Sequence, residues 1–178
     1  MASSDTQRFK IVLLGDGGTG KTSFLRRFTT GHFEHKYIAT LGHEVHHLLF
    51  NTNYGTVLLD CWDTAGQEMF GFAERCCHNT DGAVLFFDLG SKTTYKNLPK
   101  WHQKLLQVTG PIPLVVCGNK MDRPARTVLH IKVHQQWPDT AYYDVSAKSN
   151  YYYEKPFLSL LRRLMGKPDL QFVSVDEL

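Results

Sequence analysis

The chain has 178 residues, of which 42% are hydrophobic and 21% charged, a composition typical of one globular domain and not of a disordered chain. Its net charge of +3 is too small to indicate nucleic-acid binding by itself, so we expect no direct nucleic-acid partner. The sequence has no apolar run of membrane-spanning length, no signal peptide and no lipidation motif, so we expect no membrane anchor.

In the first third of the chain, short apolar runs alternate with helical patterns. Residues 8–15 predict a buried strand, and residues 20–31 predict a helix that ends at Gly31. Residues 44–62 predict a hairpin of two strands around a turn rich in Asn and Gly. The four cysteines include no C-x-x-C pair, so we expect reduced thiols.

The same alternation continues to the end of the chain. Residues 82–89 and 112–120 are nearly continuous apolar runs, as expected of parallel strands covered on both faces. The remaining helices are expected at residues 92–106, 128–136 and 154–166, and the last strand at residues 140–149.

This order of elements predicts an α/β fold: a three-layer sandwich around a six-stranded, mostly parallel sheet with one antiparallel edge strand. We expect residues 8–166 to form this domain. Residues 1–7 are expected to be a disordered arm, and residues 167–178 a short tail.

A phosphate-binding loop follows the first predicted strand. The stretch GDGGTGKT matches G-x-x-x-x-G-K-[ST] between a strand and a helix, which is the context that the motif requires. Backbone N–H groups of such a loop turn toward phosphate oxygens, and the helix N-terminus adds positive potential. Lys21 adds a charge against the outer phosphates, and the Thr22 hydroxyl can bind Mg²⁺. The candidate residues are Gly15, Asp16, Gly17, Gly18, Thr19, Gly20, Lys21 and Thr22.

The stretch DTAGQE follows the third predicted strand. Asp63 is placed to hold the hydration shell of Mg²⁺, and Gly66 can offer its backbone N–H to a terminal phosphate. Gln67 can orient a water molecule for attack on that phosphate.

Two further motifs indicate a guanine base. In NKMD, the Asp122 carboxylate can accept bonds from the ring N–H and the exocyclic amine of guanine, a pair that adenine lacks. Sites of this type discriminate by roughly 10⁴ or more. In SAK, the Ala147 N–H can meet the guanine carbonyl, and two lysine stems can flank the ring. The candidate residues are Asn119, Lys120, Asp122, Ser146, Ala147 and Lys148.

These four motifs, in this order at strand ends, resemble the small GTPase superfamily and its P-loop NTPase fold. The segments KYIATLG, WDTAGQE, TYKN, CGNK, SAKSNY and EKPF resemble the Ran family, the small GTPases of nuclear transport, over residues 8–173. The resemblance implies a switch that binds GTP or GDP with Mg²⁺, hydrolyses GTP slowly, at about 10⁻⁴ s⁻¹ without an activator, and controls cargo loading of transport receptors.

The resemblance also assigns roles in the loop after the first helix. Thr40 corresponds to the switch I threonine, which reaches Mg²⁺ and the γ-phosphate. Phe33 corresponds to the aromatic beside the base, and Tyr37 to a tyrosine near the catalytic glutamine. The implied catalytic residues are Gln67, Lys21, Thr40 and Tyr37, and the implied metal ligands are Thr22, Thr40 and Asp63.

The implied partners are import receptors of the importin-β type, exportins, a Ran-type exchange factor and a GTPase activator, with residence in nucleus and cytoplasm. Phe70 is retained, so nuclear transport factor two is a further implied partner. Ran-like sequences have a lysine at the position of Met69, and we expect a weakened contact there. They also carry a long C-terminal extension with an acidic end, which is missing after Leu178, so we expect the diphosphate state to lose a contact.

The basic patch of the Ran family is diluted in this chain by His134, Gln135, Gln136 and Trp137. We therefore expect receptor binding that is weaker and less sensitive to salt. Two alternatives remain at this point: a decoy that binds nucleotide and receptors without normal turnover, and a phosphate-loop kinase or ATPase, which Asp122 disfavours.

Three histidines stand within five residues on the predicted hairpin, which raises the question of a zinc site. On a strand, His43 and His47 share one face, and His46 lies on the other. The only near carboxylate, Glu44, points away from the face with two histidines, so we expect no zinc there. The expected metal in this region is Mg²⁺ at Thr40.

Overall fold

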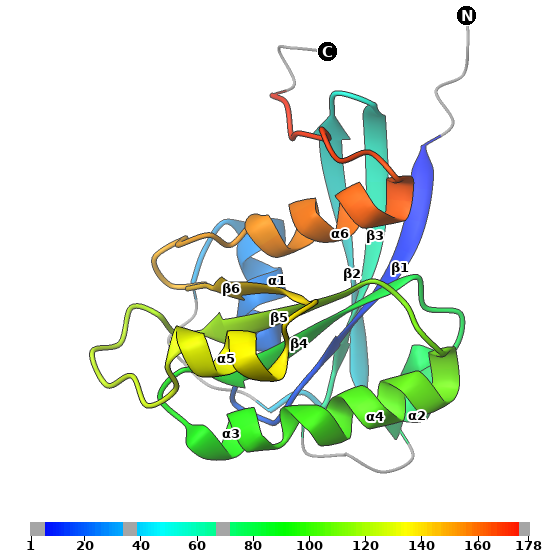
Figure 1. The fold of residues 1–178 in the computed structure, drawn as a ribbon. Coiled ribbons are helices and arrows are strands. Elements are labelled where there is room, and N and C mark those ends of the chain that lie inside the picture. Colours follow the sequence, from blue (N-terminus) through cyan, green and yellow to red (C-terminus); the bar gives the residue numbers. More distant parts are fainter. Residues whose placement is uncertain (1–5, 34–38, 67–71, 175–178) are drawn as a thin grey trace, which may run out of the picture.

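The computed structural model describes residues 6–33, 39–66 and 72–174, and of residues 72–74 only the backbone (Figure 1). Strands and helices alternate along most of the chain. The strands are β1 Gln7–Leu14, β2 His43–Thr52, β3 Gly55–Thr64, β4 Gly82–Asp88, β5 Leu114–Asn119 and β6 Ala141–Asp144. The helices are α1 Lys21–Thr30, α2 Phe72–Cys77, α3 Lys92–Lys96, α4 Leu98–Thr109, α5 His130–Gln136 and α6 Lys155–Met165.

The strands form one six-stranded sheet in the order β2-β3-β1-β4-β5-β6. β1 pairs in parallel with β3 and β4, and β5 pairs in parallel with β4 and β6. Only the edge strand β2 is antiparallel, because it forms a hairpin with β3. The predicted fold class is therefore confirmed, down to the single antiparallel edge strand.

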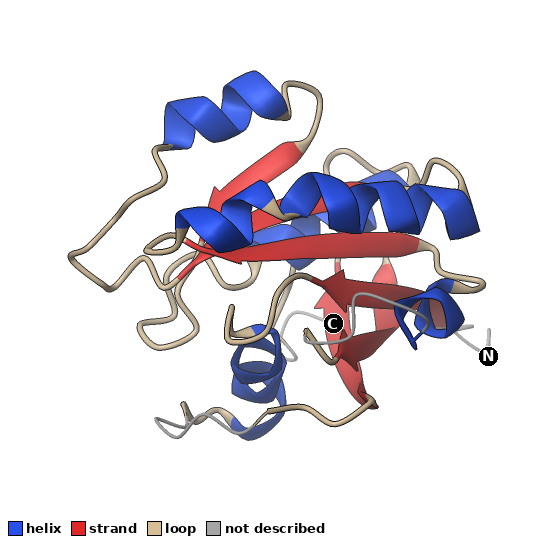
Figure 2. Ribbon diagram, turned by 90° about the horizontal axis from the view of Figure 1, so that it is seen from below, coloured by secondary structure: helices blue, strands red, loops and turns tan. Residues whose placement is uncertain are grey.

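Helices cover both faces of the sheet, and each face has its own apolar core (Figure 2). On one face, Phe24 of α1 and Phe157 of α6 pack against Ile11 and Leu13 of β1. On the other face, Trp101 of α4 packs with the alternate residues of the same strands. β4 and β5 are buried along their whole length, as their apolar runs predict.

The structure differs from the expected elements in three places. The helix expected over residues 92–106 is two helices, because it is interrupted at Asn97 and Pro99 occupies the first turn of α4, where a proline needs no N–H partner. The last strand ends at Asp144 instead of residue 149, and the chain then turns through the SAK motif. α2 was not predicted from the sequence pattern.

Beyond α6, the chain packs along the β2–β3 hairpin. Leu170 is fully buried in the core, and the ring of Phe172 stacks on Phe50 with centroids 4.7 Å apart. The Asn53 N–H donates to the carbonyl of Gln171.

Within the described ranges, none of the helices has the length and apolar character needed to cross a membrane.

Candidate functional site

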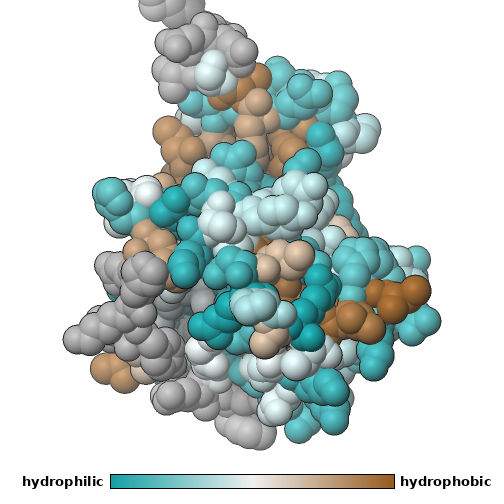
Figure 3. Space-filling model, turned by 90° about the vertical axis from the view of Figure 1, so that its left-hand side faces the viewer, coloured by the Kyte–Doolittle hydropathy of each residue, from teal (hydrophilic) through white to brown (hydrophobic). Residues whose placement is uncertain are grey.

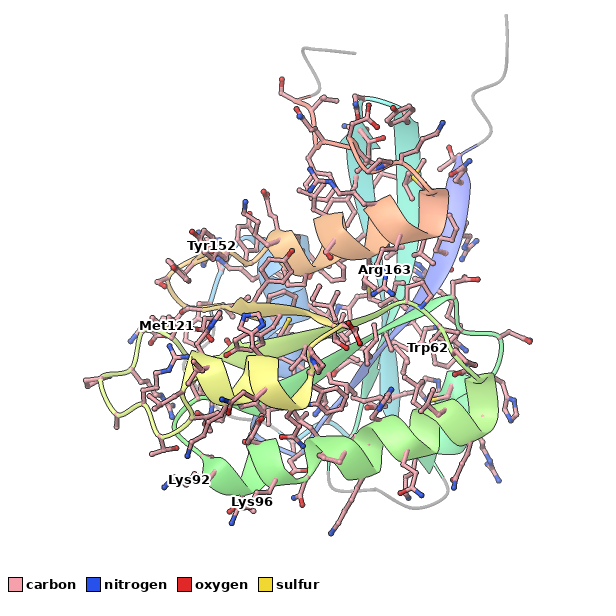
Figure 4. All side chains as sticks on the ribbon, in the orientation of Figure 1. Trp62, Lys92, Lys96, Met121, Tyr152 and Arg163 are labelled. Carbon is pink, nitrogen blue, oxygen red and sulfur yellow. The ribbon has the colours of Figure 1, made fainter. Side chains whose placement is uncertain are left out.

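The predicted site residues that the structure describes gather where β1, β3, β5 and β6 end, because parallel strands present their carboxyl ends at one edge of a sheet. Met121 and Tyr152 mark two of the loops on this side of the molecule in Figure 4. Seen from that side, the surface is mostly hydrophilic, with separate brown patches (Figure 3). A cleft of about 310 Å³ opens here. It is lined by Gly20, Ser23, Phe33, Asn119, Lys120, Asp122, Arg123, Pro124, Ala147 and Lys148.

The phosphate loop leads from the end of β1 directly into α1, so the N-terminus of that helix faces the loop. Gly20 has a φ of +93°, and a Cβ atom there would lie 2.3 Å from the Asn119 side-chain nitrogen. Only glycine fits this position, since the loop and the NKMD motif approach each other so closely. The Thr19 hydroxyl donates to the Asp16 carbonyl at 2.8 Å and holds the loop in its turn.

Lys21 places a buried positive charge inside the loop. Its ammonium donates to the Gly15 carbonyl at 2.7 Å and to the Asp16 carbonyl at 3.0 Å. Burial lowers the pKa of Lys21 to about 8, because the charged form is poorly solvated there. A phosphate group would supply a negatively charged partner for this buried ammonium. The residues present therefore fit a nucleotide phosphate.

The three predicted metal ligands converge although they come from three separate segments. The hydroxyls of Thr22 and Thr40 lie 2.7 Å apart, and Thr22 also donates to Oδ2 of Asp63. The Thr40 hydroxyl donates to the same oxygen at 3.4 Å. Burial raises the pKa of Asp63, while the bond from Thr22 and the charge of Lys21 act in the opposite direction. Oxygen donors of this kind suit a hard cation such as Mg²⁺.

Gly66 lies against the phosphate loop. A Cβ atom on Gly66 would lie 2.2 Å from the backbone nitrogen of Gly17 and 2.4 Å from the carbonyl carbon of Asp16. No side chain fits between these two backbones, so residue 66 must be glycine. This position agrees with the predicted role, in which the backbone N–H of Gly66 contacts the terminal phosphate of the nucleotide.

The base-binding motifs are fixed by hydrogen bonds between segments. The Asn119 amide donates to the Thr19 carbonyl at 2.9 Å, which joins β5 to the phosphate loop. Ser146 donates to one oxygen of Asp122 at 2.6 Å and so orients the carboxylate. Ala147 is buried behind the cleft, and Lys148 and the ring of Phe33 line its sides.

Lys120 bridges three parts of the site. Its ammonium donates to the Gly18 carbonyl at 2.6 Å and to the Asp88 carboxylate at 2.7 Å. Asp88 lies at the end of β4 and also accepts from the Gly90 N–H. The sequence pattern did not single out Asp88, although a carboxylate at the end of a buried parallel strand is a usable signal.

The side chain of Asp16 has a role of its own, apart from the phosphate-binding backbone of the loop. Its carboxylate does not face the cleft, because it accepts hydrogen bonds from the Asn97 amide at 2.6 Å and the Trp101 indole N–H at 2.8 Å. Only the backbone of Asp16 is available to a phosphate. Asn97 and Trp101 anchor the phosphate loop to the start of α4, and sequence reasoning missed both.

Some predicted residues lie outside the described part of the chain. They are Tyr37, Gln67, Met69 and Phe70, so their assigned roles stay predictions.

The sequence also matches a known protein family. The model of the Ras family matches residues 10–166, which include the phosphate loop, the DTAGQE segment and both base motifs. The match covers most of the chain and the whole of the geometry above. The chain belongs to the Ras family, and residues 10–166 form a small GTPase domain.

Proposed function

We propose that this Ras-family chain is a Ran-like guanine-nucleotide switch. It binds GDP or GTP with Mg²⁺, hydrolyses GTP slowly, and controls cargo loading of nuclear transport receptors. The observation that carries the switch is the position of Thr40. A threonine from the loop between α1 and β2 reaches the hydroxyl of Thr22 at the phosphate end of the site, so this loop can respond to the γ-phosphate.

Each part of the site has a separate task in this proposal. The loop N–H groups and Lys21 bind the phosphates, and Asp122 with Ala147 selects guanine. Thr22, Thr40 and Asp63 would hold Mg²⁺, which neutralises phosphate charge when it is bound. Gln67 orients the attacking water. As the resemblance to small GTPases implies, rapid hydrolysis depends on an activating protein.

The transport role rests on the sequence resemblance to the Ran family and on the exposed surface beside the switch. β2 is an edge strand; Leu41, just before it, is 91% exposed, and Leu49, within it, is 63% exposed. The solvent-exposed Leu41 beside Thr40 suits a protein partner that distinguishes the two nucleotide states. The proposed partners are importin-β-type receptors, exportins, a Ran-type exchange factor and an activator, in nucleus and cytoplasm.

The second surface for these receptors is proposed around α5. Arg123 and Lys132 keep positive charge there, while the exposed His134, Gln135 and Gln136 stand where the Ran family has a lysine-rich patch. Because peripheral charges mainly set association rate and salt dependence, receptor binding is expected to be weaker and less salt-sensitive than in a typical Ran-family member.

A binding experiment with a purified importin-β-type receptor tests the transport role. The Gln67→Leu variant loaded with GTP should bind, and the wild-type chain loaded with GDP should not. A Ran-family member of ordinary sequence, measured in parallel over a salt series, should show the steeper salt dependence. Equal binding in both nucleotide states would reject the role as a transport switch.

Single-turnover hydrolysis then separates the switch from a decoy. Wild-type protein loaded with GTP should turn over slowly, and a Ran-type activator should accelerate it by up to about 10⁵-fold. Gln67→Leu should abolish the acceleration. If the activator has no effect on the wild-type chain while nucleotide and receptor still bind, the chain is a decoy.

A further inference from the structure

Next to the predicted Mg²⁺ ligands, a second group of metal-binding side chains lies on the β2–β3 hairpin. Glu44 of β2 is directly opposite Asp63 of β3, and His46 follows two residues later on the same face. One donor atom from each of the three residues lies within 4.8 Å of the other two. This face is the one that α1 covers, opposite to the face of His43 and His47.

Two of the three donor atoms of this group lack hydrogen-bond partners. Nε2 of His46 and Oδ1 of Asp63 are buried, and neither has a hydrogen-bond partner among the described residues. The His46 side chain is only 7% exposed, and its Nε2 is 3.6 Å from a carboxylate oxygen of Glu44, beyond hydrogen-bond range. A buried imidazole nitrogen without a partner is costly, and a bound cation would satisfy it.

We propose that Glu44, His46 and Asp63 form a second cation site, for a divalent transition metal such as Zn²⁺, beside the Mg²⁺ of the nucleotide. An imidazole nitrogen with two carboxylate oxygens suits Zn²⁺ and Co²⁺, whereas Mg²⁺ prefers oxygen ligands alone. Three protein ligands leave a fourth position for water. Glu44 is half-exposed, so the site is open to solvent on that side.

Arg26 of α1 is the charged neighbour that competes with this cation. Its guanidinium lies 3.8 Å from the same Glu44 carboxylate, at the outer limit of an ion pair. Because both side chains are partly exposed, Glu44 can turn to the metal without leaving a buried charge behind. The two carboxylates together balance the charge of one divalent ion.

The two cations would share Asp63, and this step rests on the proposed nucleotide function. Oδ2 of Asp63 accepts from Thr22 and Thr40, which leaves Oδ1 for the second metal. Two divalent ions on one carboxylate repel each other, so each weakens the binding of the other. Zn²⁺ should therefore accelerate release of GDP by about fivefold or more.

Metal titration of the GDP-loaded chain tests the site directly. The helix α5 carries another histidine pair, His130 and His134, with ring centroids 4.3 Å apart, so all measurements use a His134→Gln background. In excess Mg²⁺, Zn²⁺ is followed by calorimetry and Co²⁺ by its visible absorption. We expect the chain to bind one equivalent of Zn²⁺ or Co²⁺. His46→Gln should lower the affinity for this metal by at least about tenfold, since even the loss of a residue that only orients a metal ligand has that effect.

The controls separate the site from unspecific binding. Glu44→Gln should weaken the metal like His46→Gln, and its exposed side chain leaves the fold intact. His47→Gln, on the opposite face, should change nothing. The proposal is overturned if the chain binds no equivalent of Zn²⁺ or Co²⁺. It is also overturned if both His46→Gln and Glu44→Gln bind the metal as tightly as before. Bound GDP is quantified separately in each sample, so a chain that binds GDP but no second metal rejects the site alone.

Discussion

The hydroxyl of Thr40 lies 2.7 Å from the hydroxyl of Thr22, although 18 positions separate them in the chain. Thr22 lies in the first turn of α1 and Thr40 shortly before β2, so the contact joins these two segments at the phosphate end of the site. Both hydroxyls also approach Asp63. This arrangement makes the loop sensitive to what occupies the metal and γ-phosphate positions.

Replacement of Thr40 by Ala should separate the two nucleotide states. The variant loses a ligand that only the triphosphate state uses, so affinity for a non-hydrolysable GTP analogue should fall by about tenfold or more. Affinity for GDP should stay within about twofold. Stopped-flow release rates of labelled nucleotides measure both values. A parallel loss of GDP affinity would place Thr40 in a purely structural role.

Ser146→Ala should weaken guanine recognition without damage to the fold. Ser146 is buried and donates to Asp122 at 2.6 Å. A hydrogen bond to a charged group contributes about 1.5–3 kcal/mol, so affinity for GDP should fall by roughly tenfold or more. Affinity for inorganic pyrophosphate, which has no base, serves as the control and should be unchanged. Equal losses for both ligands would contradict the role of Ser146 in base recognition.

Asn97→Asp should disturb the phosphate loop through the side chain of Asp16, which does not face the cleft. The substitution keeps the side-chain shape but puts a second carboxylate against Asp16, which Asn97 now donates to at 2.6 Å. Repulsion should loosen the loop at a cost of about 1–3 kcal/mol, which lowers GDP affinity by about 5- to 150-fold. Calorimetric titration with GDP measures the effect, and Asn97→Ala should show a smaller loss. If Asn97→Asp binds GDP like the wild type, the anchor contributes nothing to the site.

Asp60→Asn should change how the stability of the fold depends on pH. Burial alone would raise the pKa of Asp60, but hydrogen bonds from Arg8 and His47 outweigh it and hold the pKa below the ordinary value of 3.8. A carboxylate with a lowered folded-state pKa stabilises the fold above pH 3.8, and this contribution disappears as the pH falls through the folded-state pKa.

The free energy of unfolding should therefore be higher for the wild type than for Asp60→Asn at pH 7. The difference should shrink steadily below pH 4, as urea denaturation over a pH series would show. A constant difference at every pH would mean that the ion pairs of Asp60 contribute no stability.

The sequence motifs predicted the site well where the backbone forms it. GDGGTGKT, DTAGQE, NKMD and SAK each follow a strand, and parallel strands bring their ends together whatever the side chains between them. The interruption at Asn97 was missed because the helical periodicity continues through it, although Pro99 marks a new first turn.

Contacts between distant side chains could not be predicted in the same way. The partners of Asp16 stand 81 and 85 positions further along the chain, and no local pattern connects them. The group of Glu44, His46 and Asp63 depends on the hairpin register, because only the pairing of Glu44 with Asp63 brings a second carboxylate to His46. Two of the three histidines that stand out in the sequence, His43 and His47, lie on the opposite face of β2.

Above all, this chain should bind guanine nucleotides selectively and with Mg²⁺. The most direct measurement is the equilibrium affinity of the nucleotide-free chain for fluorescently labelled GDP and ADP, with Mg²⁺ and with EDTA. We expect GDP to bind roughly 10⁴-fold more tightly than ADP, and to bind less tightly when EDTA removes the metal. Equal affinity for GDP and ADP, or binding of GDP that is the same with and without Mg²⁺, would contradict the account.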